Sequence, residues 1–149
     1  MAQGDSKLFN DYVLKARKGV YAEGNDWRLA FLSDTYASIN TDLTNPTLAS
    51  FTNTSGGNVA ANYVLTGEAF TRSGATITFD ANDIPTIAKS GTNPADLRCA
   101  LLYNATVTND AVQVWDCTAD GTTPLDLANN DFTFSFSASG IQTTTNSNP

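Results

Sequence analysis

Residues 131–141 read DFTFSFSASGI, and their pattern predicts a strand that forms one side of a β core. Phe132, Phe134 and Phe136 are spaced by two, so in a strand they line one face while Thr and Ser line the other. A strand with one apolar face needs a second layer to cover it. We therefore expect this segment to be the last strand of a β-sandwich.

Composition predicts a single β domain with a neutral, polar surface. The chain has 149 residues, enough to bury roughly 70% of the surface that its unfolded form exposes. Only 15% of the residues are charged, against about 25% in an average soluble protein. The net charge of −7 argues against a nucleic-acid partner, because phosphate binding needs clustered Lys and Arg. Residues 1–7 lack the pattern of a secretory signal, and no apolar run is long enough to span a bilayer, so we expect no membrane partner.

Near the N-terminus the spacing of apolar residues predicts one short α-helix that begins at a Ser6 cap and ends before Gly19. Its apolar face comprises Leu8, Phe9, Tyr12, Val13 and Ala16. The basic residues Lys15, Arg17 and Lys18 fall in its last turn, where cations complement the helix dipole. A helix lying on the β core is the interpretation we adopt, with a partner-binding or membrane-surface helix as the alternative.

The next segments predict a buried strand followed by a long loop. Residues 26–33 have apolar side chains on both faces, which indicates a central strand. Residues 34–58 are rich in Ser, Thr, Asn and Gly, and a loop of this length usually packs on something. Whether it packs on its own core or on a neighbouring subunit is left open. The candidate contacts in this loop are Tyr36, Ile39, Leu43, Leu48 and Phe51.

Two hairpins are predicted further along the chain. The first joins residues 59–70 to residues 75–81 through a turn at 72–74, and the second joins residues 97–103 to residues 111–117.

In the second hairpin we place Cys99 opposite Cys117, Leu101 opposite Trp115 and Leu102 opposite Val114, which pairs apolar residues on both faces. The two cysteines would then be close enough for a disulfide, although two free thiols are equally compatible with the spacing.

The predicted fold is a mainly β, single-domain antiparallel β-sandwich over residues 1–149, of jelly-roll or Ig-like type, with one short N-terminal α-helix. Residues 1–5 and 142–149 are expected to be extended arms or tails. The tail has nothing of its own to bury, so we expect a neighbouring subunit to order it. Ile141, Gln142 and Thr143 are therefore candidate contacts with a neighbouring subunit.

No catalytic motif is found, so we predict a protein that is not an enzyme and holds no cofactor or metal. The chain has no histidine, which removes the usual general base and the common triads. The nearest carboxylate pairs, Asp80 with Asp83 and Asp116 with Asp120, fall at strand ends, where Asp commonly bonds to the backbone of a turn. Trp27 and Trp115 lie in aliphatic strands, so we expect them in the core rather than on a sugar-binding platform.

The order of these features resembles a family of small structural proteins of tailed bacteriophages. The resemblance rests on strand patterns, at residues 7–10, 27–36, 76–83, 98–103 and 131–141. The cysteine pair, and the absence of a glycine-rich turn near Asn62 and Tyr63, depart from the family pattern.

The resemblance implies a virion component, made in the host bacterial cytoplasm and located on the capsid surface as a decoration or cement protein. Its implied partners are the major capsid protein and further copies of itself, as a homo-oligomer within the particle. A neck or tail component and a carbohydrate-binding β-sandwich module are the alternatives. The polar faces of the predicted strands carry mainly Thr and Ser, with few of the edge-protecting residues of isolated β proteins, which also favours an assembly.

Overall fold

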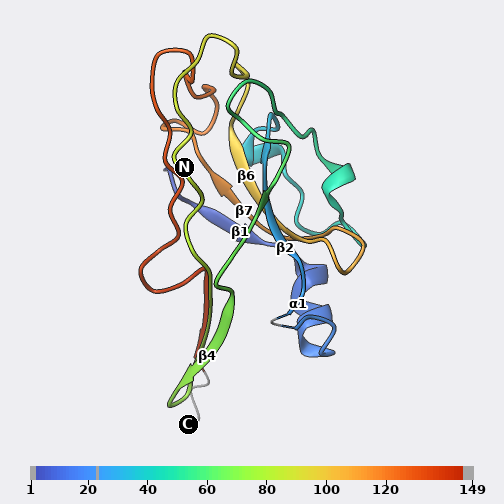
Figure 1. Cartoon of the computed structure of the whole chain (residues 1–149). Coiled ribbons are helices and arrows are strands. Elements are labelled where there is room, and N and C mark those ends of the chain that lie inside the picture. The colour runs from blue at the N-terminus through green and yellow to red at the C-terminus, as the bar shows by residue number, and fades with distance from the viewer. Residues whose placement is uncertain (1–2, 23, 146–149) are drawn as a thin grey trace.

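The computed structural model describes residues 3–22 and 24–145, which form two antiparallel sheets and one α-helix (Figure 1). The larger sheet has the strand order β1-β7-β6-β2-β3, and the smaller has the order β4-β5-β8. The fold is a mainly β sandwich with one short N-terminal helix, as predicted. The elements are β1 (Ser6–Leu8), α1 (Asn10–Arg17), β2 (Trp27–Leu32), β3 (Tyr63–Val64), β4 (Ala69–Ser73), β5 (Thr76–Asp80), β6 (Cys99–Asn104), β7 (Asp110–Asp116) and β8 (Gln142–Thr145), with 3-10 turns η1 (Tyr36–Ser38) and η2 (Leu48–Ser50).

Strands β2, β6 and β7 form the centre of the larger sheet and are buried on both faces. Leu29 pairs with Leu102 on one face, and the next pair, Ala30 with Leu101, lies on the other. All four side chains are fully buried. The central position predicted for residues 26–33 is confirmed, because β2 has a paired neighbour on each side.

The predicted phenylalanine row is present, but its segment is not a ladder strand. Phe132 and Phe134 meet the ring of Phe31 edge-on at centroid distances of 5.8 and 6.3 Å, and their side chains are half-buried. Its backbone pairs with Ile87 at an isolated bridge through Phe132, and then at Ile141, whose N–H donates a 2.8 Å hydrogen bond to the carbonyl of Phe79 as the chain enters β8. The segment is held to the larger sheet by aromatic contacts. These contacts need an extended backbone, but they do not need hydrogen bonds to a neighbouring strand.

The last strand is β8, within the segment that we had expected to be a tail. Gln142–Thr145 pair with β5, from Phe79↔Gln142 to Thr76↔Thr145. The prediction that a neighbouring subunit orders these residues is therefore wrong, because their own chain does so; residues 146–149 lie outside the described residues. The predicted arm at 1–5 is also partly paired, since Gly4 and Asp5 extend β1 through backbone bonds of 2.8 Å to Asp116, and residues 1 and 2 are not described.

The N-terminal helix begins later than predicted. Ser6 is part of β1, where its hydroxyl accepts a hydrogen bond from Gln113 at 3.1 Å, so it does not cap the helix. Phe9 occupies the N-cap position with an extended backbone and no side-chain cap. The end is as predicted: Gly19 follows the C-cap and adopts φ +72°, a conformation that favours glycine.

The second hairpin is present with a register that differs by one residue from the prediction. Cys99 pairs with Asp116, and Leu101 pairs with Val114, with a bulge between Leu102 and Tyr103. Because both faces of β6 and β7 are apolar, a shift of one residue still places apolar side chains on both faces. The sequence pattern therefore could not determine the register.

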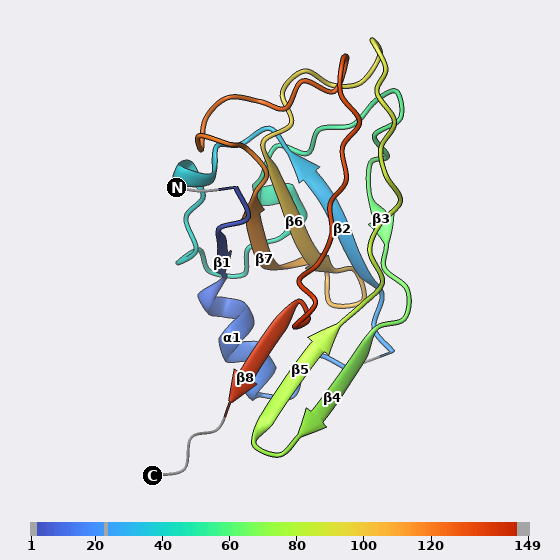
Figure 2. The ribbon, with the colours of Figure 1, turned by 90° about the vertical axis from the view of Figure 1, so that its left-hand side faces the viewer.

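The first hairpin connects β4 and β5 through Gly74 and Ala75, slightly later than the predicted turn. Of the predicted strand at 59–70, only β3 and the start of β4 form ladders. Figure 2 shows that β4, β5 and β8 extend beyond the larger sheet at the end of the molecule where α1 lies.

Replacing Gly140 with Ala should destabilise the fold by about 1–3 kcal/mol, because φ is +94° and the added Cβ would clash with Thr78 Cγ2 as the chain enters β8. Urea unfolding of the variant measures the change. Gly91→Ala is the matched control, since nothing lies within 4 Å of its added Cβ. Equal free energies of unfolding for the two variants would contradict the observed entry into β8.

Candidate functional site

The long loop at 34–58 packs on its own sheet, which answers the question left open by its sequence. Tyr36 and Ile39 are 4% and 5% exposed. The ammonium group of Lys7 lies 4.2 Å from the centroid of the Tyr36 ring and donates a 2.8 Å hydrogen bond to the Tyr36 carbonyl. Phe51 contacts Phe9 at a centroid distance of 5.5 Å. Leu43 and Leu48 are half-buried in the same covering layer.

The candidate contacts near the C-terminus are likewise used within the chain. Ile141 is buried. The side chain of Gln142 accepts a 2.8 Å hydrogen bond from the Tyr12 hydroxyl and donates one of 3.1 Å to Gln113. Thr143 is exposed, and its hydroxyl donates to the carbonyl of Ser139. Of the eight candidate contacts, only Thr143 is classed as exposed, so the surface available to a partner lies elsewhere.

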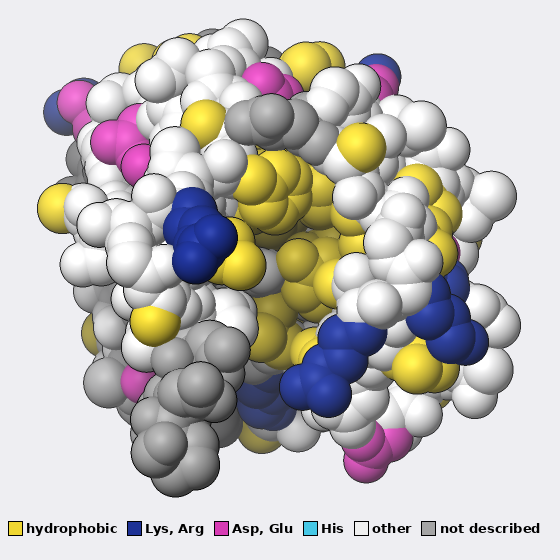
Figure 3. Space-filling model, turned by 90° about the horizontal axis from the view of Figure 1, so that it is seen from below, with side chains coloured by type: hydrophobic (Ala, Val, Ile, Leu, Met, Phe, Trp, Pro, Cys, Tyr) yellow, Lys and Arg dark blue, Asp and Glu magenta, His cyan; other side chains and the backbone are white. Residues whose placement is uncertain are grey.

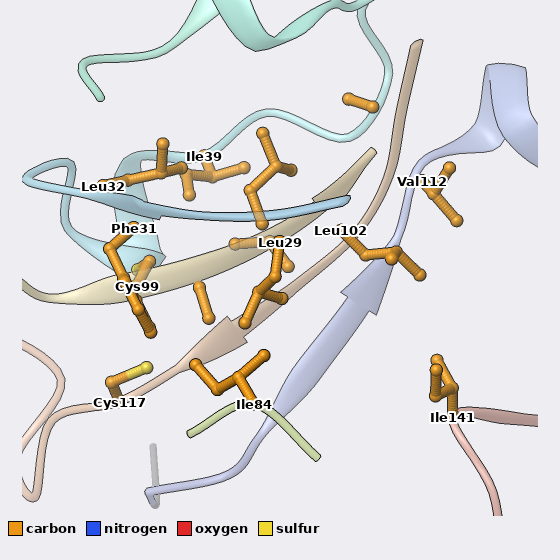
Figure 4. Close-up of a cluster of buried hydrophobic side chains, with 14 of the residues drawn as sticks. Leu29, Phe31, Leu32, Ile39, Ile84, Cys99, Leu102, Val112, Cys117 and Ile141 are labelled. Atoms are coloured by element: carbon orange, nitrogen blue, oxygen red, sulfur yellow. The ribbon is translucent and has the colours of Figure 1, made fainter. Parts of the chain in front are cut away.

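Cys99 and Cys117 are both buried free thiols, one of the two alternatives left open by the sequence (Figure 4). The Cys99 thiol lies 3.3 Å from the carbonyl of Asp34. Burial raises the pKa of Cys99 to about 12 and raises the pKa of Cys117 well above its usual value. Both groups are therefore protonated at neutral pH and are weak nucleophiles.

The four candidate carboxylates all accept hydrogen bonds, and three of them, Asp80, Asp116 and Asp120, accept from residues at most three positions later, as expected of turns. Asp80 accepts from the backbone of Ala81, and Asp83 accepts from the backbone of Phe136 at 2.7 Å. Asp116 and Asp120 each accept bonds from the backbone and hydroxyl of a threonine two or three residues later. The hydrogen bonds to Asp120 lower the pKa of its carboxyl group. Within residues 3–22 and 24–145 no group of three His, Cys, Asp or Glu side chains could hold a metal ion.

An aromatic cleft of about 460 Å³ lies between the β1 edge of the larger sheet and the 132–137 segment. Trp115 meets Phe134 and Phe136 there at centroid distances of 5.6 and 6.0 Å. The polar lining includes Gln113 and Ser6, which bond to each other. Trp115 is half-buried, so its predicted core position is only partly correct.

A second surface lies where the smaller sheet extends beyond the larger one. Phe79 packs on Trp27 at 4.8 Å, so the face of β5 that carries Phe79 is directed at the core. Ile77 lies two residues earlier and Arg72 is its cross-strand partner, so both share that face. Ile77 is nevertheless 50% exposed, because the larger sheet ends before reaching it.

Figure 3 views this end of the molecule from below and shows a hollow with hydrophobic side chains in its floor and basic side chains around it. A chain of aromatic contacts connects α1 to the β4–β5 hairpin here, from Tyr12 through Tyr21, Trp27 and Phe79 to Phe70. We call this surface the basic apolar end. We define it by the exposed residues Phe70, Ile77 and Arg72 of the β4–β5 hairpin, together with the basic residues Arg17 and Lys18 at the C-terminal end of α1.

Sequence reasoning missed both surfaces. The basic apolar end depends on β8, and the signal for β8 was the run of β-branched threonines at 143–145, which favours a strand but had been assigned to a tail. The cleft depends on the path of 131–141 across the sheet, which no local pattern specifies.

Comparisons with protein-family models, with curated proteins and with solved structures return no match. Across the described part of the chain, no helix has the length and apolar character needed to cross a membrane.

In the folded protein at mildly alkaline pH, neither thiol should react with iodoacetamide at an appreciable rate, because burial keeps both protonated. After unfolding, mass spectrometry should find both cysteines alkylated, with the same mass whether or not reductant is added first. Loss of alkylation without reductant would instead demonstrate a disulfide, and rapid labelling of the folded protein would contradict the burial.

Proposed function

We propose that the chain is a structural subunit of a larger particle, a capsid decoration or cement protein of a tailed bacteriophage. One observation carries the structural role: the inner face of the smaller sheet exposes large apolar side chains beside α1, with Ile77 50% and Phe70 37% exposed. Exposed apolar side chains that share one face of a sheet are typical of interaction sites, and this supports the proposal. The phage assignment is supported by the resemblance of the strand patterns.

In this proposal the partners are the major capsid protein and further copies of the chain, and the location is the outer surface of the head. Each copy would bury a modest surface against the shell. Because many copies act on one shell, weak single contacts add up through avidity to a large stabilisation of the particle. A rigid core suits this role, since the loop at 34–58 and the terminal strands are already packed within the subunit.

Particles assembled without this protein should lose their shell integrity at a lower temperature than complete particles do. When the ionic strength is lowered stepwise, they should also fail earlier, while the salt concentration is still higher. Thermal release of packaged DNA, followed with an intercalating dye, measures the difference, and adding back the purified protein should restore the stability. Equal stability of the two kinds of particle would contradict a cement role.

Copy number separates the head from the neck or tail. A decoration protein should be present in numbers comparable to those of the major capsid protein on a quantified gel, whereas a neck or tail component is present in few copies per particle.

A second candidate function, carbohydrate binding, is favoured by the aromatic cleft at Trp115. Its lining is mainly aromatic and neutral, with Phe, Ser and Gln side chains and the single carboxylate of Asp116, which can accept hydrogen bonds from sugar hydroxyls. Against it, Phe134 and Phe136 meet Trp115 with tilted or edge-on rings, so the indole does not form an open stacking platform. Titration of neutral oligosaccharides against tryptophan fluorescence tests this function.

A further inference from the structure

We propose that the basic apolar end binds an acidic segment of a partner protein whose apolar side chains enter the hollow. This inference deepens the proposed function, on which it rests for the identity of the partner as the shell protein.

Charge makes this end different from the rest of the surface. The whole chain has a net charge of −7 and only eight Lys and Arg residues, yet three of them are Arg17, Lys18 and Arg72. None of these three forms an ion pair with any residue that the structure describes, whereas Lys15 is held by Asp11 and Asp110 at 2.9 and 2.7 Å. An acidic partner would therefore be attracted to this end and repelled by most of the remaining surface, which orients its approach.

Arg72 is positioned to act together with the exposed apolar side chain of Ile77. Its guanidinium Nε donates a 2.9 Å hydrogen bond to the carbonyl of Gly74, which ties the side chain to the hairpin turn. Because Arg72 lies directly across from Ile77 on the same face of the sheet, one partner segment could place an apolar side chain on Ile77 and a carboxylate on Arg72. Alternation of apolar and acidic residues along that segment would fit both.

The shape of the surface favours a protein segment over a lipid bilayer. The apolar side chains lie in a hollow with basic side chains around it (Figure 3), so a flat membrane would touch the rim and leave the floor uncovered. A single strand or helix of a partner is convex and can enter. Nucleic acid would meet the strongly negative net charge of the chain and would gain little from an apolar floor.

The test uses the purified full chain and a labelled peptide in which valine alternates with glutamate. The control is the same peptide with every glutamate replaced by lysine. Fluorescence anisotropy should show binding of the acidic peptide alone, weakening as salt is added because the cations are exposed. Ile77→Ser should weaken binding by about tenfold, the change expected when burial of one large aliphatic side chain is lost. Arg72→Glu should weaken it further.

Val64→Ser is the matched control, because Val64 is 57% exposed but lies in β3 of the other sheet. Its affinity should equal that of the unchanged chain, and circular dichroism should show that all three variants fold. The inference would be overturned if the acidic peptide did not bind, if both peptides bound equally, or if Val64→Ser lost as much affinity as Ile77→Ser. It would also be overturned if the peptide did not bind and Ile77→Ser instead abolished dimerisation of the chain or its binding to phosphatidylserine vesicles. Since no particle is involved, failure here leaves the particle-stability test of the cement role unaffected.

Discussion

Strands β2, β6 and β7 carry apolar side chains on both faces, and the rest of the chain is arranged to keep water from both. A sheet of this kind normally lies between helices or a second sheet. Here one face is covered by the loop at 34–58, through Tyr36 and Ile39, and the other by Phe79 and the phenylalanines of 131–141. The loop at 34–58 and the segment at 131–141 are therefore the covering layers of the core.

The smaller sheet also covers an apolar face of the larger sheet, but it extends beyond the area that needs covering. Phe79 is needed to cover Trp27, and β4 and β8 are needed to pair the strand that carries Phe79. Once formed, this sheet continues past the edge of the core, so Ile77 and Arg72 share a face with Phe79 but have no layer opposite them within the larger sheet. The surface that we assign to a partner is therefore a by-product of how the core is closed, and it lies on paired strands rather than on a loop.

Particular residues indicate which features the sequence could predict. The segment from Trp27 to Leu32 could be identified as a central strand because apolar side chains on both of its faces must both be buried. Gly19 could be identified as the residue that ends the helix. The pairing of Cys99 could not be predicted, because two apolar faces tolerate a shift of one residue. The threonines at 143–145 favour a strand locally, but their pairing with Ile77 and its flanking threonines is a long-range contact that no local pattern specifies. Both candidate surfaces depend on long-range packing of this kind.

The closure of the core over Trp27 depends on a C-terminal strand that the chain orders by itself, without a neighbouring subunit. Hydrogen exchange of the isolated monomer, resolved at the amides of Gln142–Thr145, tests this directly. We predict protection close to that of β5, its partner in the ladder. Exchange of these amides at the rate of an unfolded chain, with β6 and β7 still protected, would show that the strand needs a neighbour and would contradict the account.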